Sequence, residues 1–499
     1  MTELLPAELS VPIRQTSKKL LPADLDKLDH LLILVPKGLA AKAWSQLPFP
    51  ELLKKLSQRD PEGVVSGRFA NASATGFSLA VLSPEATVFE RLTLARKMTA
   101  VASKEPVLGL LAHGFASGLQ GSALDALVSA ALAAAARMPS LKSKQKRERR
   151  IRSLKLFAVK ELPDLKLRQA EAQGNYLARW LTTLPPNKLN SAAYCRLVKK
   201  LAKSEGWDYR LLGQKELEKE GAGAFLAVAQ GNPERDAGIV HLKYRPKKPS
   251  EKLLTLVGKG ICFDTGGTNL KPHGAMLDMH EDMGGSAVAL GSLLAISRLG
   301  LPRPVDCWLE ISENMIGNRA YKPQDVITAS NGVTIQVIHT DAEGRMALAD
   351  TLALASRDKP GLMIDYATLT GSCVRGLTTR MSAIFSNRDY WREPLIEIGR
   401  ASGERVWPFP LDEKDFDQTL ESPIADIKQC TTDGMGDHIY AARFLRRFVP
   451  DSIPWLHIDL GACSHEGGLA HIPTQITGFG VRLTLELLST GLPKTARES

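Results

Sequence analysis

The chain has 499 residues, of which 44% are hydrophobic and 24% are charged, and its formal net charge is +10. These values are typical of a soluble globular protein with two or three domains. No apolar signal segment opens the sequence, and the most apolar window, residues 123–136, contains Asp125 and Ser129. This window predicts a buried helix and is too short for a membrane span. The six cysteines form no CxxC pair, so we expect free thiols and a cytoplasmic location, with no membrane partner.

The positive charge is concentrated in one run, residues 142–152, which holds seven basic residues and one acid, Glu148. The run supplies +6, which leaves about +4 for the rest of the chain. The simpler interpretation is a solvated loop or helix end. The alternative is a surface for nucleic acid or another polyanion, which would give the protein secondary DNA binding. No aromatic residues interleave with the run, so we favour the solvated loop.

The N-terminal region alternates apolar segments with helical patterns. We expect strands at residues 31–35, 77–82, 107–111 and 154–159, and a helix at residues 122–137. This alternation predicts a small N-terminal α/β domain over residues 1–165. The region contains no cluster of acids, histidines or glycines of a catalytic type.

A helical pattern over residues 167–184, ended by Pro185-Pro186, predicts a connecting helix within residues 166–186. From residue 187 to 499 we expect a larger α/β catalytic domain with a mostly parallel central sheet covered by helices, because its strand segments are mostly apolar. The predicted strands are residues 253–257, 305–310, 333–338, 361–366 and 455–459, and the predicted helices are residues 286–299, 345–357 and 438–448.

The segment from His339 to Arg345, HTDAEGR, carries two carboxylates two residues apart. If the strand predicted before it continues, Asp341 and Glu343 lie on one face at the strand end. Two carboxylates this close repel each other unless a cation lies between them or one of them holds a proton. The segment therefore predicts a metal ion or a shared proton.

A second segment points to the same cation. Residues 259–271, KGICFDTGGTNLK, follow an apolar strand, and Asp264 precedes two glycines that allow close approach of the backbone. Asp282 follows eleven residues after Lys271. Four carboxylates carry the charge that two divalent cations neutralise, so a hydrolytic site with two metal ions is the simplest interpretation. Taken alone, each residue has a plainer explanation: an aspartate beside glycines is most often a turn residue, and Lys271 before a proline is most often exposed.

The blocks VGKGICFDTGG, NLKP, EDMGG and HTDAEGRMALAD, in this order and spacing, resemble the signature of the leucyl aminopeptidase (cytosol aminopeptidase) family. Further similar stretches lie at residues 221–234, 313–326, 364–373 and 476–483, so the resemblance covers about residues 170–490. It implies an exopeptidase, a metal-dependent hydrolase that releases the N-terminal residue from peptides. It also implies a homohexamer of two stacked trimers and an N-terminal α/β domain.

The resemblance assigns roles to seven residues. Asp264 and Glu343 would bridge two ions, Lys259 and Asp282 would hold one ion, and Asp341 would hold the other. Lys259 can bind a metal only as a neutral amine. Lys271 would stabilise the oxyanion, and Arg345, which has no acid partner within its motif, would hold a bicarbonate that acts as the general base. Oxygen ligands favour manganese, zinc or magnesium, with cobalt as a further alternative, and the sequence does not choose among them.

The substrate pocket is less defined. Met279, Thr368 and Gly371 match positions that line the side-chain pocket of the family, although Met279 alone could be ordinary packing. Two departures affect this region: His339 replaces the usual asparagine, and Gly461 to Ser464 replace part of the usual C-terminal motif. We expect the change at Gly461 to Ser464 to alter the pocket wall. His339 could touch the site or shift the pKa values of its acids, but we favour a neutral role behind the metal ligands. The preferred N-terminal residue therefore stays open.

Two other function classes do not match the sequence. A serine or cysteine hydrolase would need a nucleophile motif, and no G-x-S-x-G occurs. A DNA-binding or scaffold protein that kept the fold would be expected to lose a metal ligand, Lys271 or Arg345, and all are present. The sequence therefore predicts a metal-dependent aminopeptidase.

Overall fold

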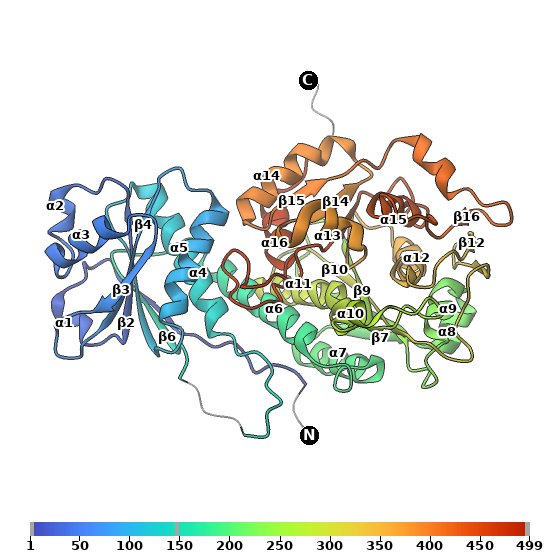
Figure 1. The fold of residues 1–499 in the computed structure, drawn as a ribbon, viewed down its shortest axis with the longest axis horizontal. Helices are drawn as coiled ribbons and strands as arrows, with labels where there is room; N and C mark the ends of the chain where they lie inside the picture. Colours follow the sequence, from blue (N-terminus) through green and yellow to red (C-terminus); the bar gives the residue numbers. More distant parts are fainter. Residues whose placement is uncertain (1–3, 145–148, 495–499) are drawn as a thin grey trace.

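The structure, a computed structural model, describes residues 4–144 and 149–494. Two α/β units lie side by side, each with its own sheet, and the helix α6 (Leu165–Thr183) runs from one toward the other (Figure 1). The structure therefore confirms the predicted fold class of a smaller N-terminal and a larger α/β unit. The proposed domain boundaries stay a prediction.

The N-terminal sheet has six strands in the order β1-β6-β5-β2-β4-β3, and every neighbouring pair except β3–β4 is parallel. Its central strands are apolar runs that are buried on both faces, as parallel strands covered by helices are. The strands are β1 (Ile13–Gln15), β2 (His30–Pro36), β3 (Val64–Arg68), β4 (Gly76–Leu82), β5 (Val107–Ala112) and β6 (Ser153–Leu156).

Five helices accompany this sheet: α1 (Pro22–Leu25), α2 (Ala41–Trp44), α3 (Pro50–Arg59), α4 (Val88–Val101) and α5 (Ser117–Ala135). Helix α4 begins at a capping box, in which Thr87 accepts a hydrogen bond from the Glu90 N–H and the Glu90 side chain accepts one from the Thr87 N–H. Helix α5 is long and apolar enough to cross a membrane, yet 61% of its apolar window is buried inside the molecule. It packs in the core beside β5 and α4, as the sequence predicts for a buried helix.

The larger sheet has eight strands in the order β15-β14-β17-β13-β9-β10-β8-β7. Its centre, β17-β13-β9-β10, is parallel, while β14, β8 and β7 are joined by antiparallel pairs. The strands are β7 (Asp208–Leu212), β8 (Gly238–Tyr244), β9 (Leu254–Asp264), β10 (Val305–Asn314), β13 (Leu362–Ala367), β14 (Ser382–Ser386), β15 (Val406–Pro408) and β17 (Trp455–Asp459).

Helices cover both faces of this sheet and form two cores. One core holds side chains of α6, α7 (Ser191–Glu205), α11 (Gly284–Leu299), α14 (Arg392–Ser402) and α16 (Val481–Thr490). The other holds side chains of α9 (Gly223–Ala229), α12 (Glu343–Ser356), α13 (Gly371–Leu377) and α15 (Asp437–Arg446). Shorter elements complete the chain: α8 (Gln214–Lys219), α10 (His273–Met276), η1 (Met279–Met283), η2 (Thr378–Arg380), η3 (Asp389–Trp391) and η4 (Lys414–Leu420).

The helices α6 and α11 cross at close range. A Cβ atom on Gly174 of α6 would lie 2.2 Å from the carbonyl oxygen of Gly291 on α11, so no larger residue fits at this crossing. Helix α6 also carries Glu171, which pairs with Arg482 of α16. One helix therefore connects the core of the larger unit to the N-terminal side of the molecule.

One predicted strand of the larger unit is wrong in its placement. Residues 333–338 do not join the large sheet; only β12 (Thr334–Gln336) is a strand, in a small sheet with β11 (Val326–Thr328) and β16 (Ile427–Lys428). The strand predicted at residues 253–257 is longer than expected and continues to Asp264. The chain is therefore extended through Lys259 and is turned at the segment that holds Asp341.

Candidate metal centre

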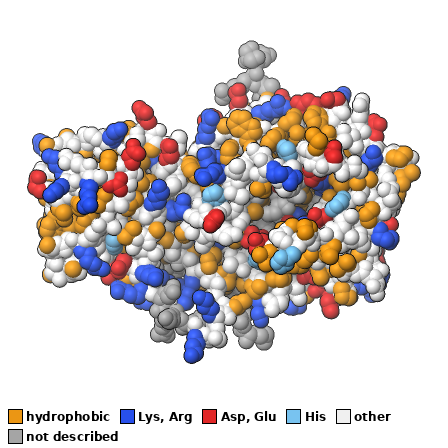
Figure 2. All heavy atoms as spheres, viewed as in Figure 1, with side chains coloured by type: hydrophobic (Ala, Val, Ile, Leu, Met, Phe, Trp, Pro, Cys, Tyr) orange, Lys and Arg blue, Asp and Glu red, His pale blue; other side chains and the backbone are white. Residues whose placement is uncertain are grey.

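The motif residues meet where the central parallel strands end. Asp264 is the last residue of β9, Asn314 is the last residue of β10, and Thr368 directly follows β13. The carboxyl ends of parallel strands are where open α/β sheets place their ligands. Figure 2 shows a hollow in the surface of the larger unit, bordered by acidic, basic and histidine side chains. The site therefore lies in a recess at the carboxyl edge of the sheet.

Three carboxylates come together at this edge. Oxygens of Asp264, Asp341 and Glu343 lie within 4.8 Å of one another. The predicted convergence of Asp341 and Glu343 is present, but its predicted cause is wrong. Asp341 lies in a turn and Glu343 is the first residue of α12, so a turn and a helix start bring the two together, and no strand face is involved.

Lys259 lies beneath this group and is 2% exposed. Its Nζ lies 2.7 Å from Asp282 Oδ2 and 3.0 Å from Glu343 Oε1, and it donates a hydrogen bond of 3.0 Å to the carbonyl of Thr368. Burial opposes the charge of this ammonium, but the neighbouring carboxylates outweigh that effect and raise the pKa of Lys259. An ion held by the neutral amine would therefore displace the Lys259 proton.

Asp282 joins the group from η1. It is 6% exposed, and its Oδ1 accepts hydrogen bonds of 2.7 Å from Lys259 Nζ and from Thr368 Oγ1. Burial, followed by repulsion from Glu343, raises the pKa of Asp282 to about 6. Thr368 thus ties the segment after β13 to a candidate metal ligand.

Lys271 contacts two of the acids, Asp264 and Asp341. Its Nζ lies 2.8 Å from Asp264 Oδ2 and 2.5 Å from Asp341 Oδ1. Burial opposes the charge of this ammonium, yet Asp264, Glu343 and Asp341 together raise the pKa of Lys271. Lys271 is therefore a fixed positive charge at the edge of the acidic group.

The charges around the group do not balance. Four carboxylates face two lysine ammoniums, which leaves two formal negative charges in a mostly buried place. Burial and mutual repulsion raise the pKa of Asp264, Asp282 and Asp341. Glu343 Oε2 is buried and accepts no hydrogen bond from the described residues. A buried carboxylate oxygen without a donor and an excess of negative charge both fit divalent cations at this site.

Arg345 lies in the first turn of α12 and is 1% exposed. Its Nη2 lies 2.6 Å from Asp437 Oδ2, and its Nη1 donates a hydrogen bond of 3.2 Å to the carbonyl of Gln429. Burial opposes its charge, but Asp437 outweighs this and raises the pKa of Arg345. Arg345 thus has an acid partner, Asp437, that its own motif did not reveal.

The predicted pocket residues lie at two places. Met279 is in η1, three residues before Asp282, and Thr368 contacts Asp282 directly. Gly371 begins α13 and is exposed. Asp459 holds the segment between Thr368 and Gly371, because it accepts hydrogen bonds from the Leu369 N–H (3.1 Å) and from Thr370 Oγ1 (2.6 Å).

The structure also places the two departures from the family pattern, at His339 and at Gly461. His339 is exposed, and its Nδ1 accepts a hydrogen bond of 3.3 Å from the N–H of Asp341. Gly461 lies behind α13, where an added Cβ would be 3.1 Å from Cys373 Sγ. His339 therefore touches the backbone of a candidate ligand, whereas Gly461 belongs to the packing behind the pocket.

Three further residues hold the site together and were missed from the sequence. Asn314 Nδ2 donates hydrogen bonds to Asp264 Oδ1 (2.8 Å) and to the carbonyl of Thr340 (3.0 Å). Thr340 Oγ1 donates to the carbonyl of Gly266, and Gln429 Oε1 accepts from the N–H groups of residues 338 and 339. Asn314 lies in a stretch that resembles the family, so its position could have been singled out; Gln429 carries no such signal.

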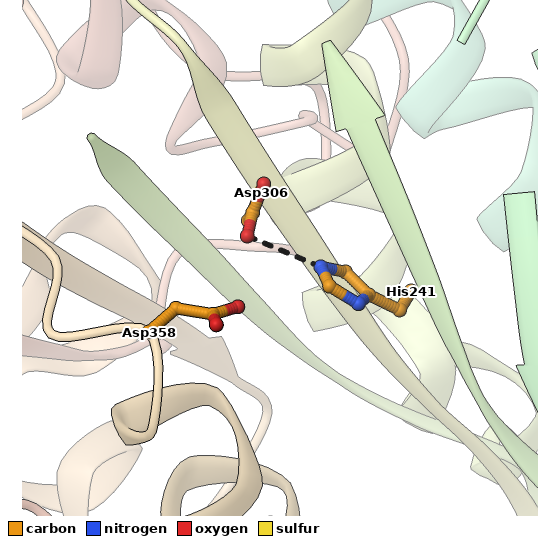
Figure 3. Close-up of side chains that lie close together, drawn as sticks. All are labelled: His241, Asp306 and Asp358. Carbon is orange, nitrogen blue, oxygen red and sulfur yellow. Dashed lines mark ion pairs between the residues drawn. The ribbon is translucent and has the colours of Figure 1, made fainter. Parts of the chain in front are cut away.

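A second group of possible ligands lies elsewhere on the same sheet. His241 Nε2 lies 3.2 Å from Asp306 Oδ2, and Asp358 approaches the pair from the loop after α12 (Figure 3). Asp306 is eight residues before the end of β10, roughly 25 Å along the strand from the first site. The other oxygen of Asp306 is 2.5 Å from Arg245 Nη2, and the His241 ring stacks on Trp308 at 3.8 Å. The acid already has two cationic or donor partners, so we interpret this group as a packing network.

The basic run gives no support for a second site. Residues 145–148 lie outside the described residues. Arg149, which is described, lies 3.4 Å from Asp29 and 3.9 Å from Glu105. Part of the charge of this run is thus matched by acids of the N-terminal unit.

Comparison with known proteins agrees with this geometry. Residues 176–485 match the model of the catalytic domain of the cytosol aminopeptidase family. A protein of Syntrophotalea carbinolica named "probable cytosol aminopeptidase" is 44% identical over 316 residues, which are 63% of each chain. A protein of the same name from Syntrophobacter fumaroxidans is 41% identical over 319 residues, 64% of this chain and 63% of the relative. The match thus spans a little under two thirds of the length of these relatives.

Solved structures extend the similarity to nearly the whole chain. A mutant of tomato leucine aminopeptidase superposes with a TM-score of 0.84 at 25% identity and covers 98% of both chains. The bottromycin maturation enzyme BotP, in complex with Mn, superposes with a TM-score of 0.81 at 30% identity and covers 93% of this chain and 99% of that one. The family match, its extent and the arrangement of the motif residues lead to one conclusion: the chain belongs to the cytosol aminopeptidase family.

Proposed function

We propose that the protein is a metal-dependent aminopeptidase, a hydrolase that releases the N-terminal residue from peptides with a free N-terminus. The observation that carries this proposal is the convergence of Asp264, Asp341 and Glu343 oxygens within 4.8 Å. Family membership and the buried Glu343 Oε2, which lacks a donor among the described residues, support it. The names of the relatives support a cytosolic location, and a homohexamer stays a prediction from the family resemblance.

Five side chains are proposed to hold two divalent ions per subunit: Lys259, Asp264, Asp282, Asp341 and Glu343. Manganese is the first choice because BotP is described in complex with Mn; zinc, magnesium and cobalt are the alternatives. Two such ions, when bound, supply Lewis-acid activation of a water molecule and of the substrate carbonyl. The protein must then provide orientation, charge balance and a shaped pocket.

Lys271 is proposed to stabilise the oxyanion. Its ammonium stands at the rim of the acidic group, and its side chain is 13% exposed, so it faces the recess while remaining largely desolvated. A preorganised cation in such a place interacts more strongly with developing negative charge than it would in water. The contacts with Asp264 and Asp341 fix its position before a substrate arrives.

The substrate side chain is proposed to lie against Met279, Thr368 and Gly371. Thr368 is held by Asp282 on one side, and the segment after it is held by Asp459. Gly371 leaves open space, since an added Cβ there would meet only Arg375 Nη1, at 3.9 Å. The pocket is thus built on two segments that are fixed to the candidate ligands and to β17.

The test uses the full chain freed of metal by a chelator and then supplied with Mn²⁺, Zn²⁺, Mg²⁺ or Co²⁺. The metal-free protein should hydrolyse no aminoacyl-amide substrate, and at least one ion should restore the reaction. A matched peptide with an acetylated N-terminus should stay intact, because an exopeptidase needs the free amine. Full activity in the chelated protein, or equal cleavage of the acetylated peptide, would contradict the proposal.

A further inference from the structure

The site contains a buried arginine whose charge must be neutralised. Arg345 lies two residues after Glu343 in α12 and is 1% exposed. A buried guanidinium is costly unless an anion accepts its hydrogen bonds. The resemblance to the family implies that a bicarbonate ion takes this place.

Both terminal nitrogens of the guanidinium are already engaged. Arg345 Nη2 contacts Asp437 Oδ2 at 2.6 Å and Nη1 donates to the carbonyl of Gln429 at 3.2 Å, while Nε is buried and has no hydrogen-bond partner among the described residues. An arginine binds a planar anion best through two parallel N–H groups. Here one terminal nitrogen faces a carboxylate and the other a carbonyl. No two neighbouring nitrogens of the guanidinium are both free, so a bicarbonate ion would have to displace Asp437 or the Gln429 carbonyl to bind Arg345 with two hydrogen bonds.

Local structure holds Asp437 where it is. Gly436 has a φ of 61°, a left-handed conformation that favours glycine, and the chain then enters α15 with Asp437 as its first residue. The N-terminal end of a helix stabilises a carboxylate. The next residue, His438, is anchored to Ser372 of α13, because its N–H donates to Ser372 Oγ at 2.8 Å and its Nδ1 lies 2.9 Å from the same oxygen. The carboxylate is thus aimed at Arg345 by its own helix.

Asp437 is also partly exposed to solvent. Its side chain is 24% exposed, whereas that of Arg345 is 2% exposed. Among residues 4–144 and 149–494, none donates a hydrogen bond to Asp437 Oδ1. The carboxylate therefore neutralises the guanidinium with Oδ2, while Oδ1 can still accept a hydrogen bond.

We propose that Asp437 replaces the exogenous anion at Arg345, so that this chain supplies its own carboxylate and works without bicarbonate. This inference rests on the proposed aminopeptidase function. Asp437 is separated from Arg345 by 92 residues, and it is the Arg345–Asp437 ion pair that identifies it. In this chain the negative charge beside Arg345 belongs to the Asp437 side chain and does not depend on dissolved carbonate.

The first experiment needs no variant. The wild-type chain, loaded with Mn²⁺, is assayed in buffer freed of carbon dioxide and again after addition of millimolar bicarbonate, with chloride at the same ionic strength as the control. We expect the same rate in all three solutions. A rate that rises several-fold with bicarbonate alone would overturn the proposal.

The second experiment removes the carboxylate. Asp437→Asn should lower kcat on the order of 100-fold in carbonate-free buffer, and bicarbonate should restore much of the loss. Asp437→Glu keeps a carboxylate and should stay independent of bicarbonate. Asp433→Asn is the matched control, because Asp433 is an exposed acid in the same loop whose contact is a hydrogen bond from the Met435 N–H to Oδ1, an oxygen that asparagine retains. It should behave as the wild type.

A binding measurement separates this inference from the activity. Bicarbonate should raise the melting temperature of Asp437→Asn, whose Arg345 lacks its anion, and should leave that of the wild type unchanged. An equal rise in both proteins would show that the wild-type guanidinium is free to bind the ion, and the inference would be wrong. If the wild type hydrolyses no peptide with any ion, the proposed function fails, while this measurement still decides the role of Asp437. If Asp437→Asn does not fold, the wild-type rate and melting measurements decide it.

Discussion

Gly344 lies directly against the side chain of Lys259. A Cβ atom added at position 344 would be 2.4 Å from Lys259 Cε and 2.7 Å from its Nζ. Gly344 is a helical residue of α12, so its backbone conformation would tolerate alanine. The glycine between Glu343 and Arg345 is therefore required by space, because the tip of Lys259 passes where a methyl group would be.

The first prediction concerns this contact. Gly344→Ala should leave the fold nearly as stable as before, because the atoms it displaces are the flexible end of a lysine and alanine favours a helix. It should nevertheless move Lys259 Nζ from Asp282 and Glu343, and a displacement of about 1 Å at such a site costs on the order of 100-fold in rate. Thermal unfolding and kcat/KM are the two measurements. The control is Gly121→Ala in α5, where an added Cβ meets nothing within 4 Å and activity should not change.

The second prediction separates catalysis from ion binding. Lys271→Gln removes the positive charge that lies 2.8 Å from Asp264 and 2.5 Å from Asp341. We expect kcat to fall about 100- to 1,000-fold because a charged donor to the oxyanion is lost. Divalent ions should bind more tightly, since a competing cation is gone. Calorimetric titration with Mn²⁺ and steady-state kinetics check the two effects.

Lys322→Gln is the control for Lys271, because Lys322 has a side chain that is 67% exposed and pairs only at 3.8 Å with Asp325. It should change neither quantity. A Lys271→Gln protein that lost ion affinity together with kcat would show instead that Lys271 supports the ligands, and the oxyanion role would be wrong.

The third prediction concerns Glu171, which is buried between Arg482 at 2.8 Å and Arg168 at 2.7 Å. Burial alone would raise its pKa, but the two arginines outweigh burial and hold the pKa of Glu171 well below its usual range. Such a carboxylate stabilises the fold at pH values above 4.5, the pKa of an ordinary glutamate, and this contribution is lost progressively as the pH falls below it. Glu171→Gln should lower the free energy of unfolding at pH 7 by about 3–5 kcal/mol.

Chemical denaturation at several pH values measures this effect. The difference between the wild type and Glu171→Gln should shrink as the pH falls below 4.5. Glu161→Gln, a change at an exposed glutamate, should show no difference at any pH. A difference that stays constant down to low pH would mean that the loss arises from packing and not from charge.

The fourth prediction concerns His30 in β2. Burial, with a smaller effect of Arg68, lowers the pKa of His30 to about 4, and its Nε2 lies 2.8 Å from Ser78 Oγ. The folded chain therefore holds this ring neutral, whereas the unfolded chain takes up a proton near pH 6.5. Stability should fall as the pH is lowered from 6.5 toward 4, by roughly 2 kcal/mol at pH 5. Unfolding of the N-terminal unit at pH 7 and pH 5 measures the loss.

In His30→Gln this part of the pH dependence should disappear, because glutamine can still form a hydrogen bond to Ser78 but does not titrate. The control His273→Gln, a change at an exposed histidine, should keep the pH dependence of the wild type. If the wild type and His30→Gln lost the same stability between pH 7 and pH 5, another group would be responsible.

Local patterns were sufficient for the central strands. Residues 455–459 and 361–366 are mostly apolar segments, and they form β17 and β13 almost as predicted. The segment before Asp341 was harder, because its alternating pattern forms a strand only over Thr334–Gln336, in a small separate sheet. Periodicity shows that a segment can be a strand and does not show which sheet it joins. Asp341 and Glu343 converge because a turn is followed directly by the start of α12, and a two-residue period does not predict this arrangement.

The partners of the site residues could not be found in this way. Arg345 contacts Asp437 and Gln429, and Asp264 contacts Asn314, across separations of 92, 84 and 50 residues. Such pairs are set by the order of strands in the sheet and by where α15 begins, and neither follows from local composition. Resemblance to a family could locate the seven motif residues, whereas Asp437 is found only from the three-dimensional contact.

The close crossing of α6 and α11 has a practical consequence for dissecting this molecule. A fragment starting at residue 187 would keep every motif residue, yet it would leave the glycine surface of α11 and the guanidinium of Arg482 facing water. Arg482 also donates to Ser129 Oγ at 3.2 Å and lies 3.5 Å from Asp125, both on α5. We expect such an excised fragment to be insoluble, so that the shortest soluble form of the protein must retain the N-terminal region as part of its scaffold.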